Sequence, residues 1–113
     1  MQITLVEKQN KTVGANTYER RVYEAGAYMV TMEITTYGDE KPLRRIYTEA
    51  KDRSDRFLPE IYFQDDFFGS SVPRFEVQTS SFGALSVDEF AAFLAKQQIG
   101  LETAQALQAF FVK

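Results

Sequence analysis

Hydrophobic and polar residues alternate along the first two thirds of the chain, and the pattern then changes to a helical period. The clearest strand runs from Ala27 to Thr36, where one side carries the apolar residues Tyr28, Val30, Met32 and Ile34. Such one-sided alternation is typical of a sheet with one face on a core and the other in water. From Leu85 to Val112 a helical period predicts an apolar face made of Phe90, Phe93, Leu94, Leu101, Ala104 and Phe111. Strands followed by one helix predict an α+β fold of antiparallel strands packed against a long C-terminal helix.

Glycines spaced twelve residues apart, at Gly14, Gly26 and Gly38, indicate the turns of an antiparallel meander. Besides Ala27–Thr36, the pattern predicts strands at Gln2–Val6, Thr17–Tyr23, Leu43–Ala50, Ile61–Phe63 and Arg74–Thr79. In the last of these, the inward-facing residues are expected to be Phe75, Val77 and Thr79. Polar loops are expected at Gln9–Asn16 and Asp65–Pro73.

The hydrophobic pattern also predicts a register for the two strands that flank Gly38. Placing Ile34 opposite Ile46 makes the apolar sides of the two strands coincide. A slip of one residue would bring Arg45 opposite Ile34 on the buried face, where an unpaired charge is costly.

The predicted helix begins with a capping box, because Ser86 is followed three residues later by Glu89. Leu94 falls in the middle of the predicted apolar face, and its side chain is expected to be buried. Gly100 either lies inside one continuous helix, which the unbroken apolar phase favours, or ends a first helix and separates it from a second. A helix-turn-helix is not expected even then, because Glu102–Phe111 contains no lysine or arginine to contact phosphates.

The length of 113 residues predicts a single domain, residues 1–113, and 44% apolar residues supply ample material for one core. A net charge of −3 with both signs scattered along the chain argues against binding to nucleic acid or to an anionic membrane. The longest apolar run, Phe90–Ala95, is far too short to span a membrane. The lack of cysteine and of signal-peptide features predicts a cytoplasmic protein.

Most catalytic chemistry is not expected from this composition. Histidine and cysteine are both absent, and no two glycines are close enough for a phosphate-binding loop, so no cofactor is predicted. Ser70-Ser71 and Ser80-Ser81 lack an imidazole, although a serine–lysine pair with Lys51 or Lys96 is conceivable. The chain is therefore expected not to be an enzyme, with an enzyme of unrecognised type using Asp or Lys as the alternative.

The candidate binding surface is the loop that contains Asp65, Asp66, Phe67 and Phe68. Two adjacent phenylalanines in a loop cannot easily both point inward, and exposed aromatic rings beside polar residues are typical of a contact surface. The alternative is that Phe68 lies beneath the edge of the sheet and Phe67 covers the helix. The acidic pair could hold Mg²⁺, but two solvated carboxylates in a loop are the commoner explanation, and no metal site is predicted.

Two segments carry a resemblance over nearly the whole chain, namely Leu58-Pro59-Glu60-Ile61-Tyr62-Phe63 and the sequence Phe82-Gly83-Ala84-Leu85-Ser86-Val87-Asp88-Glu89-Phe90. With strands before them and a helix after them, they resemble a small family of domains of unknown function from lactobacilli and related Gram-positive bacteria. The resemblance implies an α+β fold with two sheets packed against one helix, and a role in amino-acid metabolism. It also implies a remote likeness to prokaryotic S-adenosylmethionine decarboxylases.

The chemistry of those decarboxylases does not carry over to this chain. They cleave themselves before a serine, typically after glutamate, and use histidine and cysteine, whereas this sequence has no Glu-Ser dipeptide, histidine or cysteine. We therefore expect a non-catalytic module that binds a small molecule or a protein partner on a related scaffold. A self-associating structural protein is a further alternative, and the sequence leaves monomer and homodimer equally open.

Overall fold

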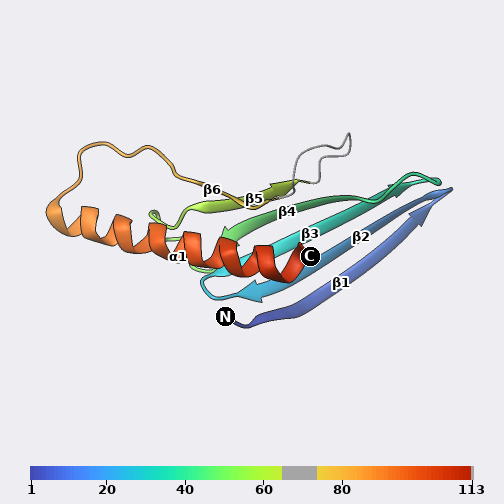
Figure 1. Ribbon diagram of the computed structural model, residues 1–113, viewed down its shortest axis with the longest axis horizontal. Helices are drawn as coiled ribbons and strands as arrows, with labels where there is room; N and C mark the ends of the chain where they lie inside the picture. Colours follow the sequence, from blue (N-terminus) through green and yellow to red (C-terminus); the bar gives the residue numbers. More distant parts are fainter. Residues whose placement is uncertain (65–73, 113) are drawn as a thin grey trace.

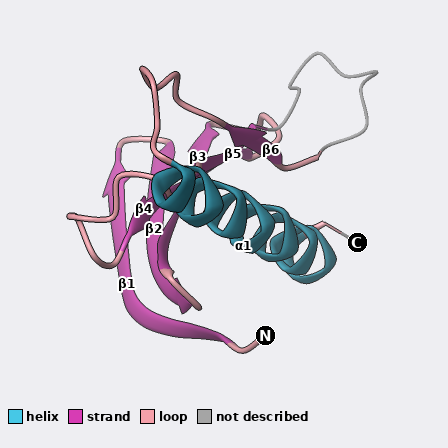
Figure 2. Cartoon of the chain, turned by 90° about the vertical axis from the view of Figure 1, so that its left-hand side faces the viewer, coloured by secondary structure: helices cyan, strands magenta, loops and turns pink. Residues whose placement is uncertain are grey.

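The computed structural model describes residues 1–64 and 74–112, and they form one sheet and one helix (Figure 1). Six antiparallel strands pair in chain order, so each strand lies beside its neighbours in sequence. The strands are β1 (Ile3–Val13), β2 (Asn16–Ala25), β3 (Tyr28–Tyr37), β4 (Leu43–Ala50), β5 (Glu60–Gln64) and β6 (Glu76–Gln78). The helix α1 covers Val87–Phe111 and lies on one face of the sheet (Figure 2). The predicted α+β class is confirmed. The two sheets that the resemblance implies are not found, because the six described strands pair into a single sheet.

Glycine makes the tight turns of the meander possible. Gly14, Gly26 and Gly38 all have a positive φ, between 54° and 59°, which a residue with a Cβ adopts only at a cost. Each follows the end of a strand, so the predicted turns are confirmed.

The core lies between the sheet and the C-terminal half of α1. The fully buried side chains there include Tyr28 and Val30 from β3, Ile46 from β4, Phe63 from β5 and Leu107 from α1. Burial raises the pKa of Tyr28, whose hydroxyl therefore stays protonated and donates a hydrogen bond to the Pro59 carbonyl at 2.6 Å. This bond links β3 to the loop before β5.

The predicted register of β3 and β4 is wrong by two residues. Ile46 lies opposite Met32 instead of Ile34, and Glu33 lies opposite Arg45. A shift of two residues keeps every side chain on its predicted face, so both registers bury the same apolar residues. The observed register also places opposite charges side by side on the solvent face, which the predicted register does not.

The polar loop predicted at Gln9–Asn16 is also wrong in most of its length, because β1 continues to Val13. After Ile3 every residue of β1 is exposed, since the strand lies at the edge of the sheet and beyond the region that α1 covers. A strand that buries neither face has no apolar alternation to reveal it. At the other edge β6 is shorter than predicted, and Thr79 is exposed outside it instead of facing inward.

The capping box and the continuous helix are both confirmed. The Ser86 side chain accepts from the Glu89 amide, and the Glu89 carboxylate accepts from the Ser86 amide, each at 3.2 Å. The latter bond lowers the pKa of Glu89. Gly100 lies within the helix, and a Cβ added there would lie 2.3 Å from the Pro59 Cγ. Close packing against Pro59 therefore explains a glycine in a helix interior.

Loss of this cap should weaken the fold measurably. We expect Ser86→Ala to lower the free energy of unfolding by about 1 kcal/mol, because the Glu89 amide loses its acceptor. Urea denaturation measures the change, and Ser81→Ala, in the exposed segment before the helix, serves as the control. Equal midpoints for the two variants would contradict the role of the cap.

The predicted apolar face of α1 is partly wrong. Phe90, Leu94 and Leu101 are each about half exposed, at 52%, 51% and 50%. Of the predicted face only Ala104 is buried, and the other buried residues of the helix are Gly100, Thr103 and Leu107. Apolar side chains lie on nearly every side of this helix, so periodicity alone did not identify the face that packs on the sheet.

The N-terminal half of α1 extends beyond the ends of the strands (Figure 1). There it packs on the segment before β5 and on the segment before the helix itself. The rings of Phe57, Phe82 and Phe93 meet there, with centroids 5.1 to 6.2 Å apart. Arg56 lies over the Phe57 ring and pairs with Glu89 at 3.1 Å. A small aromatic cluster thus holds the projecting part of the helix.

Candidate functional site

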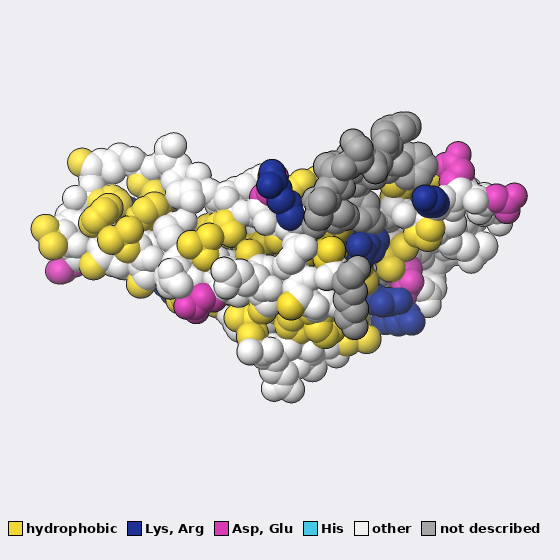
Figure 3. All heavy atoms as spheres, in the orientation of Figure 1, with side chains coloured by type: hydrophobic (Ala, Val, Ile, Leu, Met, Phe, Trp, Pro, Cys, Tyr) yellow, Lys and Arg dark blue, Asp and Glu magenta, His cyan; other side chains and the backbone are white. Residues whose placement is uncertain are grey.

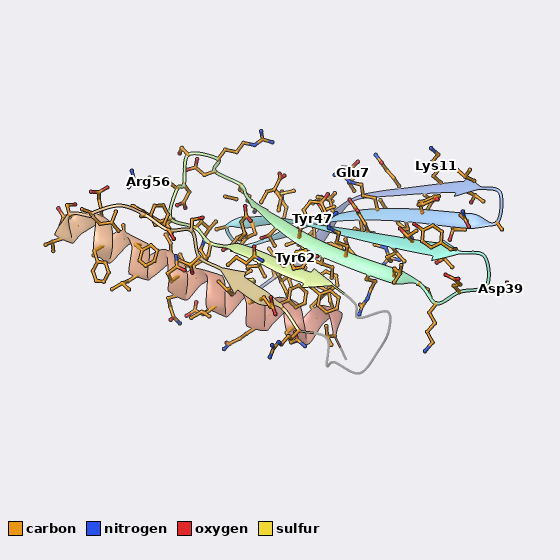
Figure 4. All side chains as sticks on the ribbon, turned by 90° about the horizontal axis from the view of Figure 1, so that it is seen from above. Glu7, Lys11, Asp39, Tyr47, Arg56 and Tyr62 are labelled. Carbon is orange, nitrogen blue, oxygen red and sulfur yellow. The ribbon has the colours of Figure 1, made fainter. Side chains whose placement is uncertain are left out.

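The face of the sheet opposite α1, which we call the outer face, carries the candidate site. Side chains alternate between the two faces of a strand, so the buried Val30 points to α1 and Glu33 points to the outer face. The one helix in the described part of the chain lies on the opposite side and leaves the outer face uncovered (Figure 2). Figure 4 shows Glu7, Lys11, Tyr47 and Tyr62 on strands β1, β4 and β5.

A trough of about 640 Å³ lies on this face. It is near the C-terminal ends of β1 and β3 and the N-terminal end of β2. Two rows of side chains form its walls, each row crossing the three strands. One row consists of Gln9, Arg20 and Glu33, and the other of Lys11, Tyr18 and Thr35. The rows are two residues apart along each strand, or roughly 7 Å. Between them the backbone forms the floor, at Asn10, Glu19 and Ile34. We call this the outer-face trough.

Opposite charges face each other in one wall without forming an ion pair. Arg20 lies directly opposite Glu33, yet its Nη1 is 3.6 Å from the Glu7 carboxylate. The Glu33 carboxylate instead accepts a hydrogen bond from the Tyr47 hydroxyl at 3.1 Å. The two charged groups therefore diverge, one toward β1 and the other toward β4.

The second wall adds a cation and an aromatic ring. Lys11 is exposed and forms no ion pair with any residue in the two described ranges. The Tyr18 ring is half-buried and is held by an edge-on contact with Tyr37, with ring centroids 6.4 Å apart. The trough thus offers two cations on the β1 and β2 side, one carboxylate on the β3 side and an aromatic surface between them. It can accept a molecule that carries both signs of charge.

The loop that the sequence singled out, with Asp65, Asp66, Phe67 and Phe68, lies outside the described residues, and the structure therefore does not test it. The trough residues were missed because a site on a sheet face depends on the register of three strands. Its only signal in the sequence was the mixture of charged, amide and aromatic residues at alternate positions of β1 and β2.

The conceivable serine–lysine pairs are not formed in the described part of the chain. Lys96 lies 2.6 Å from the Asp55 carboxylate, and Lys51 lies 3.8 Å from that of Glu24. Within residues 1–64 and 74–112, no three acidic side chains are grouped closely enough to hold a metal ion. The adjacent Arg20 and Arg21 of β2 point to opposite faces of the sheet, and Arg21 pairs with Glu19 at 2.6 Å.

The one described helix is not apolar enough over its length to cross a membrane. The described geometry therefore offers one open, charged and aromatic trough on the bare face of the sheet. No protein-family model, curated protein or solved structure matches this chain.

Proposed function

We propose that this chain is a non-catalytic binding module that takes small zwitterions of the amino-acid type in the outer-face trough. The observation that carries the proposal is the divergence of Arg20 and Glu33, which are neighbours on adjacent strands but point to different partners. A molecule with a carboxylate and an ammonium group matches the two ends of this gap. The proposal agrees with a role in amino-acid metabolism.

Each wall of the trough has a distinct part in the proposed binding. The ligand carboxylate pairs with Arg20 and Lys11, because charge-assisted hydrogen bonds to carboxylates are among the strongest that proteins form. The ligand ammonium pairs with Glu33, and the Thr35 hydroxyl is a further partner. The Tyr18 ring then contacts the aliphatic or aromatic side chain of the ligand. Because the trough is open to water, we expect weak binding, with a dissociation constant of about 1 mM to 10 μM.

Titration with single amino acids tests the proposal. In nuclear magnetic resonance spectra, the backbone amides of Asn10, Glu19 and Ile34 should shift, because they form the floor. Lys11→Met and Glu33→Gln should each weaken binding by about tenfold, the effect of losing one charged partner. Lys41→Met, in the exposed turn between β3 and β4, is the matched control and should leave the affinity unchanged.

Modified ligands assign the two charges separately. An N-acetylated amino acid has no ammonium group, so its weaker binding should no longer depend on Glu33 but should still depend on Lys11. An amino-acid amide lacks the carboxylate, so its binding should depend on Glu33 and no longer on Lys11. Shifts that map to another surface, or no shift with any amino acid, would refute the trough as the site. If the trough is only a gap between long side chains, no amino acid will shift any amide signal.

A further inference from the structure

The exposed side of α1 carries a stripe of apolar residues that the rest of the described chain, residues 1–64 and 74–112, leaves uncovered. The stripe consists of Val87, Phe90, Leu94 and Leu101, and Val87 is 86% exposed. At 100° per residue, these four fall within about 60° of one another around the helix axis. In Figure 3 hydrophobic side chains gather over α1 on the side that faces the viewer.

Charged residues are missing from this side of the helix. The arc of about 120° that contains the stripe has otherwise only alanine, valine and glutamine: Ala91, Gln97, Gln98, Gln105, Gln108, Ala109 and Val112. A helix that faces water normally has lysine and glutamate there, and 26% of this chain is charged. Loss of charge together with exposed aromatic and aliphatic side chains is characteristic of the centre of a protein interface.

A groove of about 640 Å³ continues the same surface toward the C-terminus of α1. It lies between β6 and the helix, and its lining includes Arg74, Phe75, Val77, Leu101 and Gln105. The Gln108 side chain closes its base, where Oε1 accepts from the Phe75 amide at 3.0 Å. The surface therefore protrudes at Phe90 and Leu94 and is hollow beside Gln105.

From these features we infer that α1 is the interface between two copies of this chain, packed antiparallel about a two-fold axis near Gln97 and Gln98. In this arrangement Leu94 of each copy meets Leu101 of the other copy. Phe90 of each copy then enters the groove of the other copy at Gln105. A symmetric contact requires a surface that is complementary to itself, and this one places its protrusion and its hollow at equal distances from the axis.

Charge and area both suit a second copy as the occupant. The helix stripe carries no charge, so it can meet its own copy without repulsion between like charges. Arg74, the one charged residue among the described residues that line the groove, pairs with Glu76 at 3.9 Å. The paired surface is about 27 Å long from Phe90 to Gln108. We expect a helix and groove of that length to bury about 1,200 Å² in total, the lower limit for stable protein–protein interfaces. The dissociation constant of the dimer should therefore be micromolar.

Sedimentation equilibrium tests the inference on the full chain. The wild type should show a monomer–dimer equilibrium, and Leu94→Glu should raise the dissociation constant at least about tenfold, because each dimer would bury two carboxylates. Val13→Glu is the matched control, since Val13 is equally exposed, at 51%, but lies on β1. It should leave the equilibrium unchanged. A wild type that remains monomeric up to about 1 mM would overturn the inference.

Disulfide trapping gives a second readout that does not depend on a loss of binding. The chain has no cysteine, so Leu94→Cys combined with Leu101→Cys introduces the only two thiols. Within one helix they are about 10 Å apart, too far to form a bond, whereas in the proposed dimer each faces its partner in the other copy. We expect a covalent dimer under mild oxidation and none from Leu5→Cys with Val13→Cys on β1. Linkage through β1 instead would show that the edge of the sheet is the contact. Neither experiment involves the outer-face trough, so either proposal can fail without the other.

Discussion

Leu107→Ala is expected to lower the free energy of unfolding by about 2–5 kcal/mol, the usual cost of emptying a fully buried leucine site. The Leu107 side chain is 0% exposed and belongs to the same cluster as Tyr28 and Ile46. The cavity would lie where the helix meets the centre of the sheet, and the surrounding strands cannot close it without losing their register.

Leu94→Ala provides the matched control, because it makes the same change in the same helix. Leu94 is 51% exposed, so its loss should cost well under half as much as the loss of Leu107. Both variants should be compared by urea denaturation at a concentration where light scattering finds only monomers. Equal costs would mean that the helix packs on the sheet through the face with Leu94 and not through the face with Leu107.

Gly100→Ala should destabilise the protein, although the same change in an ordinary helix interior stabilises it by about 1 kcal/mol. The new Cβ would lie 2.3 Å from the Pro59 Cγ and 3.3 Å from its Cδ, and the proline ring cannot rotate away. Crowding of this kind typically costs about 1–3 kcal/mol. The change would also disturb the hydrogen bond from Tyr28 to the Pro59 carbonyl.

Two further variants identify the cause. Gly83→Ala is the control, because a Cβ at Gly83 meets no atom within 4 Å, and it should leave the urea midpoint nearly unchanged. Pro59→Ala removes the crowded ring, so the double variant with Gly100→Ala should be less destabilised than the two separate costs predict. Simple additivity would show that Pro59 is not what excludes a side chain from position 100.

The sequence predicted best those elements whose signal is local. The glycine turns and the cap at Ser86 depend on residues within a few positions, and both are confirmed. Prediction failed at β1 and at the buried face of α1. An edge strand with both faces in water has no apolar alternation, and a helix with apolar residues all round has no unique buried side.

The register of β3 and β4 and the outer-face trough were missed for a related reason. Registers that differ by two residues bury the same side chains, so the apolar pattern cannot choose between them. In the structure Glu33 lies opposite Arg20 on one side and Arg45 on the other. The trough likewise depends on register, that of β1, β2 and β3, because Lys11, Arg20 and Glu33 are far apart in sequence and become neighbours only across strands.

The pairing of strands in chain order has a consequence for how the protein folds. Each of the strands β2, β3 and β4 can pair with the one before it by closing a loop of only a few residues, and such local pairings form quickly. The helix differs, because its buried Leu107 belongs to a core cluster whose buried members from the sheet precede it by more than forty residues. The long strands can therefore assemble as successive hairpins, while the apolar face of the sheet is covered only when the last part of the chain docks. Until then the face that carries Tyr28, Val30 and Ile46 is open to water, and the nascent chain is most prone to aggregate at this stage.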